Sequence, residues 1–349
     1  LEFNIKGIAA IPNRFEDGYG LNKKMVERLI QNEVDLIITV DNGITSNTAL
    51  EYAKDNHIDV IITDHHKIPD NLPPIYALIH PELTPDDSLY KTIAGVGIAY
   101  ILAVKILEYS SNKEIIYDLR DLLCIGTLSD MAPIRGANKY WLKSYLKHLK
   151  YTNILGLQCI IRLAGLSHKE INSEDIGYKI APRINAVGRL SDPSNVINLF
   201  IENDYEKAIK LAKGLEELNN NRKSLVEGII HEAKAIIDSN NKEIPSFILL
   251  AQEHWHQGVI GIVASRLLDI YNRPTAILSG SNYDTFTGSI RSNGTFSVLE
   301  LLNYCADCLD RYGGHKYAGG FTVKAVNLGR LQDKVYEFSN QWAQNQNLR

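Results

Sequence analysis

The stretch VDLIITVDNGITSNTALEYAKDNHIDVIITDHHKIP, residues 34–69, decides the fold. It holds two short apolar runs, residues 36–40 and 60–63, which are rich in Ile, Val and Thr and are typical of buried strands. Between them, the Thr-Ser pair at 45–46 can cap a helix that runs to about residue 56. The order strand, helix, strand predicts two neighbouring parallel strands in a doubly wound α/β sheet.

Each apolar run is followed directly by an aspartate, Asp41 after the first and Asp64 after the second, and His65 and His66 come next. Parallel strands end at the same edge of a sheet, where doubly wound folds bind ligands, so we expect these side chains to face one cleft. Carboxylate and imidazole ligands together fit Mn²⁺ or Mg²⁺ better than a structural zinc. The alternative is that Asp41 caps a turn and the histidines lie on a polar loop. Two histidines directly after a strand and an aspartate weaken that alternative.

The segments TDHH, residues 63–66, and VDNGIT, residues 40–45, resemble the signature motifs of the DHH phosphoesterase superfamily. IPNRFEDGYGL, residues 11–21, resembles a segment of RecJ-type exonucleases. That family places a further strand upstream, ending in a DxDxDG cluster, whereas the aspartates before the first strand here are Asp17, expected in a turn, and Asp35. The resemblance therefore implies one complete and one stripped metal site. The chain is expected to be an amino-terminally shortened fragment or a degenerate homologue, and the intact later motifs favour the fragment.

The segment DLLCIGTLSDMAP ends an apolar run on Asp130, beside a Pro-containing turn. It resembles the fourth motif of the DHH family. The resemblance implies that Asp41, His65 and Asp130 bind a metal ion. By the same resemblance, Asp64 orients the neighbouring imidazole, and His66 contacts the scissile phosphate or protonates the leaving oxygen.

Composition narrows the class of protein. The 349 residues are enough for two domains, and the formal net charge of −4 restricts any nucleic-acid surface to a local patch. Four cysteines give no disulfide framework, and Cys305 and Cys308 are expected in a reduced, packed helix rather than at a zinc site. We find no signal peptide and no apolar run long enough to span a bilayer, so we expect a cytoplasmic protein.

Three segments between the motifs allow more than one interpretation. The run Pro69–Pro85 is predicted to be a loop, in which His80, followed by Pro81, is a turn residue. Gly95 and Gly97 begin a predicted helix, where they could let the backbone approach a phosphate or could simply pack the helix against the sheet. KYWLKSYLKHLKY, residues 139–151, has the aromatic and basic residues that suit single-stranded nucleic acid, but its spacing also fits an amphipathic helix with a solvated lysine face, which we favour.

Residues 177–200, GYKIAPRINAVGRLSDPSNVINLF, are punctuated by Gly and Pro and are not expected to form a plain helix. Two arginines placed there can bind phosphate oxygens, or they can tie two domains together through salt bridges. The match to the RecJ pattern PRxNAxGR favours contact with substrate by Arg183, Asn185 and Arg189. From Asp204 the alternation of polar and apolar residues predicts one or two connecting helices.

A second domain is expected to start near Ile244, with a strand at 247–251, a Gly-rich turn, a helix and a further strand. Its order of motifs, ending in GGHKYAGG at 313–320, resembles the substrate-binding domain associated with DHH enzymes. The candidate substrate residues of this domain are His256, expected to line an interdomain cleft, Ser289 and Arg291, expected to point the same way on one strand, and Gly314 and His315, whose glycine-flanked backbone could offer amides to an anion.

The sequence therefore predicts an α/β protein. Residues 1–165 form a doubly wound, amino-terminally incomplete DHH domain, 166–243 a helical connector, and 244–349 a smaller α/β DHH-associated substrate-binding domain. Loss of an inner strand from the sheet should leave an apolar strand edge exposed and make the isolated chain poorly stable or prone to aggregation.

The RecJ resemblance implies a monomeric exonuclease that degrades single-stranded DNA from the 5′ end by two-metal hydrolysis with Mn²⁺ or Mg²⁺. A single-strand-binding protein or a helicase is the expected protein partner. RecJ proteins usually continue into an oligonucleotide-binding barrel, and we expect this chain to be without that module. The alternatives are a phosphodiesterase acting on short oligonucleotides or cyclic dinucleotides, and a catalytically dead nucleic-acid-binding homologue.

Overall fold

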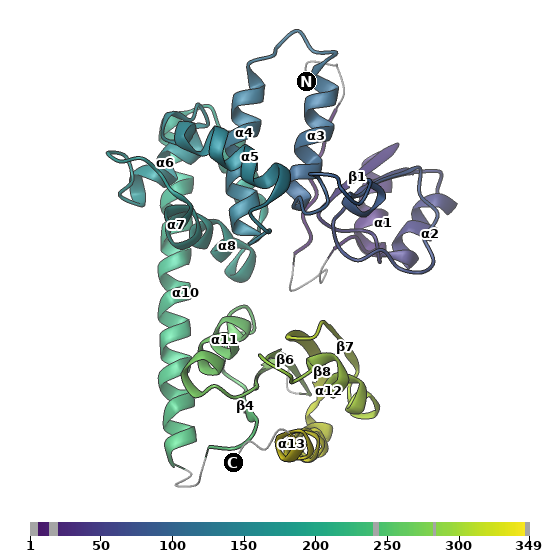
Figure 1. Ribbon diagram of the computed structural model, residues 1–349, viewed down its shortest axis with the longest axis vertical. Helices are drawn as coiled ribbons and strands as arrows, with labels where there is room; N and C mark the ends of the chain where they lie inside the picture. The colour runs from purple at the N-terminus through teal and green to yellow at the C-terminus, as the bar shows by residue number, and fades with distance from the viewer. Residues whose placement is uncertain (1–5, 14–19, 240–243, 282–283, 346–349) are drawn as a thin grey trace. The chain divides into compact units, whose positions relative to one another are not determined.

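The computed structural model describes residues 6–13, 20–239, 244–281 and 284–345. It divides into two compact units, Leu1–Asn219, called unit 1 here, and Asn220–Arg349, called unit 2 (Figure 1). Asp17, predicted to lie in a turn, is outside the described residues. None of the helices formed by the described residues is long and apolar enough to cross a lipid bilayer.

Unit 1 contains a parallel sheet in the order β1-β2-β3, made of β1 (Leu36–Val40), β2 (Asp59–Thr63) and β3 (Ala77–Ile79). The helix α2 (Asn47–Asp55) joins β1 to β2 and buries three small or apolar side chains against the sheet core. This confirms the predicted strand, helix, strand unit. β3 was predicted to be loop, and that prediction is wrong for these three residues. A strand this short, set among prolines, has too few residues to show a strand pattern.

β1 forms one edge of this sheet, since its single partner among the described strands is β2. Its residues alternate strictly in burial. Ile37 and Thr39 are buried, whereas Leu36, Ile38 and Val40 are 44%, 44% and 47% exposed. Parallel sheets normally have both faces covered, so this is an unusual apolar surface. The predicted exposed apolar edge is therefore present in the structure.

Helices make up the remainder of unit 1. α3 packs against α4, and the cores of unit 1 lie around the sheet and around α6 and its neighbours. The helices are α1 (Lys23–Gln31), α3 (Gly95–Leu107), α4 (Ile115–Ser129), α5 (Gly136–Tyr145), α6 (Leu155–Leu163), α7 (Ser173–Asp175), α8 (Ala181–Leu190) and α9 (Ser194–Ile201), with short 3-10 helices at Pro81–Leu83 and Leu146–Tyr151.

The stretch at 177–200 is helical but is not one plain helix, as predicted, because it contains a π-helical stretch and a break at residues 191–193 between α8 and α9. α7 continues into one π-helical stretch, Ile176–Ile180, and then directly into α8. Pro182 comes two residues after the π-helical stretch, where the regular α-helical hydrogen bonding is already interrupted, so the missing N–H of proline does not end the helical segment. Lys169 and Lys179 both pair with the buried Asp175 at the start of this segment.

The long helix α10 (Tyr205–Ser239) follows α9 and is one continuous helix of 35 residues, as predicted from the alternation after Asp204. The division between the units falls inside it. Its first turns bury Ala208, Ala212 and Leu215 in the same core as α6, so residues 166–219 pack within unit 1. The predicted division into a domain, a connector and a second domain remains a proposal about the chain's organisation.

Unit 2 is built on a five-stranded sheet in the order β4-β5-β6-β8-β7. β4 and β5 are parallel and the other pairs are antiparallel. Its core joins the sheet to α12 and α13 through buried aromatic and aliphatic side chains. The elements are β4 (Ile248–Gln252), α11 (Ile260–Tyr271), β5 (Thr275–Ser281), β6 (Thr285–Arg291), α12 (Val298–Tyr304), β7 (Arg311–Gly314), β8 (Ala318–Lys324) and α13 (Leu328–Asn345), with 3-10 turns at Ala306–Cys308 and Ala325–Asn327.

Candidate metal centre

Asp41 follows the last residue of β1 and has a φ of 63°, in the left-handed region that residues other than glycine rarely adopt. The next side chain, Asn42, stabilises this turn. Its amide donates to the Val40 carbonyl at 2.8 Å, and its oxygen accepts from the Leu21 backbone N–H at 3.2 Å. Non-glycine residues held in such conformations occur often at functional sites. The sequence motif pointed to Asp41, but the role of Asn42 was not predicted.

Asp64 follows the last residue of β2 and is 1% exposed. Its carboxylate accepts hydrogen bonds from the backbone N–H of Ile44 at 3.2 Å, of His65 at 2.8 Å and of His66 at 3.1 Å, and from His66 Nδ1 at 2.6 Å. Burial alone would raise the pKa of Asp64, but the hydrogen bonds from His66 and Ile44 outweigh it and lower the pKa to about 2. Asp64 is therefore an ionised carboxylate that fixes the loop carrying both histidines.

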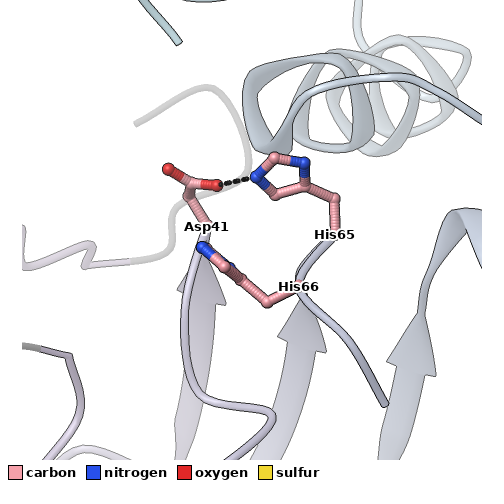
Figure 2. Close-up of side chains that lie close together, drawn as sticks. All are labelled: Asp41, His65 and His66. Atoms are coloured by element: carbon pink, nitrogen blue, oxygen red, sulfur yellow. Dashed lines mark ion pairs between the residues drawn. The ribbon is translucent and has the colours of Figure 1, made fainter. Parts of the chain in front are cut away.

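His65 lies close to two carboxylates. Its Nε2 is 2.9 Å from Asp41 Oδ1 and 3.9 Å from Asp130 Oδ2. Figure 2 shows Asp41 and His65 pointing toward each other from neighbouring strand ends, with His66 beside them. The hydrogen bond with Asp41 raises the pKa of His65 against the opposing effect of burial. The His65 ring thus lies beside two carboxylates, whose negative charges would stabilise a cation.

One atom each from Asp41, His65 and His66 lie within 4.8 Å of one another. Asp41 Oδ1 is buried and makes no further hydrogen bond among the described residues besides its ion pair with His65. A buried carboxylate oxygen beside two ring nitrogens fits a divalent cation with mixed oxygen and nitrogen ligands. Because Nδ1 of His66 donates to Asp64, its Nε2 lone pair is free for a ligand when the ring is neutral.

Asp130 caps the carboxyl end of α4, where its N–H still bonds to the Gly126 carbonyl. Burial raises the pKa of Asp130, and His65 opposes that increase. A negative charge at a helix carboxyl end is unfavourable because the helix dipole is negative there, so this carboxylate needs a nearby cation. The structure therefore brings Asp130 to the edge of the Asp41–His65 pair, as the motif order predicts.

His80 was predicted to be a simple turn residue, but it supports the site. Its ring is buried, Nε2 donates to the His66 carbonyl at 2.7 Å, and Nδ1 accepts from the Glu82 N–H at 3.1 Å. These two bonds fix the ring in a single tautomer. His80 thereby holds the backbone of the DHH loop in place. The sequence signal that could have indicated this role is a histidine placed directly between the short strand β3 and a proline.

Arg183 lies on α8 and is engaged within unit 1. Its guanidinium forms a two-pronged ion pair with Glu216, with Nη2 at 3.0 Å from Oε1, and it also donates to the Lys179 carbonyl. These bonds occupy the donors of the Arg183 guanidinium, which corresponds to a salt-bridge role rather than to contact with a phosphate. On the same helix, Asn185 is exposed and Arg189 is half-buried and has a partner.

In unit 2, Ser289 and Arg291 point to the same side of β6, as predicted, and Arg291 Nη1 donates to Ser289 Oγ at 3.0 Å and to the Ile290 carbonyl at 2.7 Å. Gly261, in the first turn of α11, lies against both. A Cβ there would be 3.0 Å from Arg291 Nη2 and 3.1 Å from Ser289 Oγ. Burial lowers the pKa of Arg291, which makes a nearby anion favourable. His256 accepts a hydrogen bond from the Gly258 N–H at its Nδ1.

Gly314 and His315 form the end of the β7–β8 hairpin. The N–H of His315 donates to the Ala318 carbonyl at 2.8 Å, so the prediction that this amide is offered to an anion is wrong. Gly314 pairs with Gly319, and a Cβ on Gly314 would lie 2.5 Å from the Ala318 oxygen. The glycines are thus explained by the close approach of two strands. The ring of His315 remains exposed.

Two family models match the chain, the DHH family N-terminal domain over residues 5–127 and the DHHA1 domain over 244–342. A crystal structure of exonuclease RecJ bound to manganese matches with a TM-score of 0.81 and 31% identity, covering 95% of this chain and 82% of that one. The chain belongs to the RecJ family. Membership in this family confirms the predicted resemblance and the predicted α/β fold class.

Two further RecJ proteins place the chain within that family. The RecJ of Bacillus subtilis is 36% identical over 331 residues, which is 95% of this chain and 41% of that protein. The RecJ of Thermus thermophilus in complex with Mn²⁺ matches with a TM-score of 0.79 and 31% identity, covering 90% of this chain and 47% of that one. The chain therefore spans less than half the length of these two relatives.

Proposed function

We propose that this chain is a single-strand-specific DNA exonuclease that hydrolyses phosphodiester bonds from the 5′ end with Mn²⁺ or Mg²⁺. The observation that carries the proposal is the cluster of Asp41, His65 and His66, with donor atoms within 4.8 Å of one another at the ends of two parallel strands. RecJ relatives that match most of this chain are described as single-stranded-DNA-specific exonucleases, and two of their structures hold manganese.

Asp41, His65 and Asp130 would hold the metal ion, which would activate water and neutralise charge on the scissile phosphate. The donor set, two carboxylates and an imidazole, fits manganese or magnesium. The family expectation is a pair of ions, whereas among the described residues one cluster of three donors is found, Asp41, His65 and His66, with Asp130 Oδ2 3.9 Å from His65 Nε2. One ion per chain is therefore the minimum that the proposal requires, and a second ion would need additional ligands.

His66 would act on the phosphate or on the leaving oxygen. Its hydrogen bond with Asp64 raises the pKa of His66, which favours the protonated form of the ring. Asp64 holds Nδ1, which leaves Nε2 as the atom that can donate this proton. Asp64 is thus a positioning residue for His66, and His80 performs the same task through the His66 carbonyl.

Substrate binding is proposed for residues in both units. Ser289 and Arg291 provide a hydroxyl and a guanidinium that can bind a phosphate, and a hydrogen bond to a charged group contributes about 1.5–3 kcal/mol. Arg183 would have to exchange its ion pair with Glu216 to contact a phosphate, so we place it lower. The remaining candidates are Asn185, Arg189, His256, Gly314 and the exposed ring of His315.

The cellular setting is also part of the proposal. All four cysteines are buried and free, which suits a reducing compartment such as the cytoplasm. Single-stranded DNA is the proposed partner, and a single-strand-binding protein or a helicase is the proposed source of it. We propose a monomer, because the cluster is complete within one chain. Sedimentation of the purified chain tests that state directly.

The test is hydrolysis of 5′-phosphorylated single-stranded DNA, labelled at its 3′ end, by the purified chain with Mn²⁺. We expect early release of unlabelled mononucleotides from the wild type and none from Asp130→Ala. Asp59→Ala is the matched control, since Asp59 begins β2 at the opposite end of the same sheet and is exposed. No release from a folded wild type would overturn the proposal. Cleavage of a dinucleotide alone would replace it with a phosphodiesterase of short substrates.

A further inference from the structure

The first residue of α3, Gly95, lies directly against the side chain of Asp41. A Cβ at Gly95 would be 2.4 Å from Asp41 Oδ1, 2.6 Å from its Cβ and 2.7 Å from its Cγ. Real Cβ atoms essentially never approach other atoms to less than 3.0 Å. A side chain at position 95 is incompatible with the present position of Asp41, because its Cβ would overlap both the Cβ and the carboxylate group of Asp41.

The neighbouring Gly97 provides a contrast on the same helix. A Cβ there would meet Ile93 Cβ at 3.1 Å and Trp141 Cζ3 at 3.2 Å, which are apolar packing contacts. The two glycines, which the sequence alone could not assign, therefore face different surroundings. Gly97 serves helix packing, and Gly95 serves the approach of the helix to an acidic side chain.

We infer that Gly95 is a positioning residue for Asp41. With the start of α3 against it and Asn42 fixing the turn, the Asp41 carboxylate is held 2.9 Å from His65 despite its left-handed backbone. The inference rests on the proposed function to the extent that Asp41 binds metal. It adds that the position of the Asp41 carboxylate depends on the absence of a side chain at position 95, on a helix that is distant in sequence from Asp41.

The test compares Gly95→Ala with Gly97→Ala in the whole chain. Replacing glycine by alanine in a helix has the same propensity effect in both variants, so any difference between them comes from the contacts. We expect Gly95→Ala to weaken Mn²⁺ binding, followed by electron paramagnetic resonance, by about 10–100-fold, as does loss of groups that orient a metal ligand. Gly97→Ala is expected to lower the unfolding temperature and to keep the Mn²⁺ affinity within about 2-fold of the wild type.

A second readout needs no metal. At one fixed pH, the ¹⁵N chemical shifts of the His65 ring report its pairing with Asp41, and we expect them to change in metal-free Gly95→Ala but not in Gly97→Ala. Absence of Mn²⁺ binding in the wild type would overturn the proposed function while this measurement still decides the role of Gly95. Unchanged His65 shifts in Gly95→Ala, or equal changes in both variants, would overturn the inference.

The inference can still be tested if Gly95→Ala misfolds. The three closest contacts involve the Cβ and the carboxylate of Asp41, so Asp41→Gly removes the atoms that the new methyl group would overlap and also suits the left-handed backbone. The double variant should then recover the stability that Gly95→Ala loses. Failure of the double variant to recover it would show that Gly95 is needed for another reason and would refute the inference.

Discussion

The two units hold their charged side chains in opposite ways. In unit 1, the carboxylates of Asp41 and Asp130 converge on His65, so negative charge is concentrated and a cation is stabilised. In unit 2, Arg291 bonds to a hydroxyl and to its own backbone, and the described residues supply it with no carboxylate. A guanidinium without a counter-ion is suited to an anion. The difference supports our proposal that unit 1 binds a metal ion and that unit 2 binds a phosphate.

The difference follows from how each sheet arranges side chains. β1 and β2 are parallel and paired up to Val40 and Thr63, so the residues that follow them, Asp41 and Asp64, emerge at the same sheet edge. In unit 2 the two candidate side chains, Ser289 and Arg291, lie on one antiparallel strand, two residues apart, and therefore on the same face. A parallel sheet brings together side chains that follow separate strands. A single strand places alternate side chains of its own sequence on one face.

The largest expected effect is loss of the metal centre. Asp41→Asn removes a charged ligand, and since a metal ion supplies several kcal/mol of transition-state stabilisation, we expect the rate of DNA hydrolysis to fall by about 10³-fold or more. Chelation by EDTA should do the same reversibly, with recovery on addition of Mn²⁺. Initial rates measure both effects. Asp59→Asn, at the other end of the sheet, should keep wild-type rates, and equal loss in that control would break the contrast between the units.

The second prediction compares two arginines. Arg291→Met should raise KM for single-stranded DNA by about 10–100-fold, because a hydrogen bond to a charged group contributes about 1.5–3 kcal/mol, with little change in unfolding temperature. Arg183→Met should leave KM near the wild type but destabilise the chain by about 2 kcal/mol, since Glu216 would lose the partner of a half-buried ion pair. Steady-state kinetics and urea unfolding separate the two outcomes, and a reversal between the variants would contradict our assignment.

The sequence predicted the parts of the site that depend on strand ends. Asp41, Asp64 and His65 follow β1 and β2 directly, and two apolar runs of five and four residues are enough to predict where those strands stop. The alternation of Ser289 and Arg291 on β6 follows from strand period alone. These predictions required no knowledge of how distant segments pack.

The contacts that it could not predict join segments far apart in the chain. Gly95 against Asp41, His80 against the His66 carbonyl, and Arg183 against Glu216 all depend on tertiary packing. The Gly and Pro pattern at 177–200 indicated that this segment is not one plain helix, but it could not predict the π-helical stretch before Pro182. Local patterns specify elements well but leave their mutual contacts open.

Burial of acids in unit 1 gives a pH-dependent prediction. Burial raises the pKa of Asp121 on α4 to about 6 from an ordinary 3.8, against the effect of a hydrogen bond with Thr152. The folded state thus binds this proton more tightly than the unfolded state, so stability falls as pH rises from about 4 to about 6, by about 2–3 kcal/mol in total. Asp121→Asn should be more stable than the wild type above pH 6 and equal to it near pH 4.

Calorimetry of both proteins at the two pH values tests this prediction. Arg291→Met is a useful control, because a change in unit 2 should not alter the pH dependence that originates in α4. A constant difference between wild type and Asp121→Asn at both pH values would mean that Asp121 is not the group responsible. The acids of unit 1 would then resemble those of unit 2, such as Asp307, which is half-exposed and paired with Arg330.

The smallest effect on stability is expected at the sheet edges, where the units also differ. In unit 2 the edge strand β7 has four residues and ends in two glycines, so it offers little apolar surface. In unit 1 the edge strand β1 exposes Leu36, Ile38 and Val40. Exposed apolar edges are templates for pairing between chains, and a lysine on such a strand prevents it.

Ile38→Lys should therefore reduce self-association, measured by light scattering, while the free energy of unfolding changes by less than about 0.5 kcal/mol, as is usual for a surface substitution. The matched control is Ile37→Lys. Ile37 is the next residue on the same strand, but it is 7% exposed on the opposite face, so a lysine there should unfold unit 1. If Ile38→Lys destabilises the chain as much as Ile37→Lys does, the outer face of β1 is covered in solution, and the apolar edge is an interface rather than a free surface.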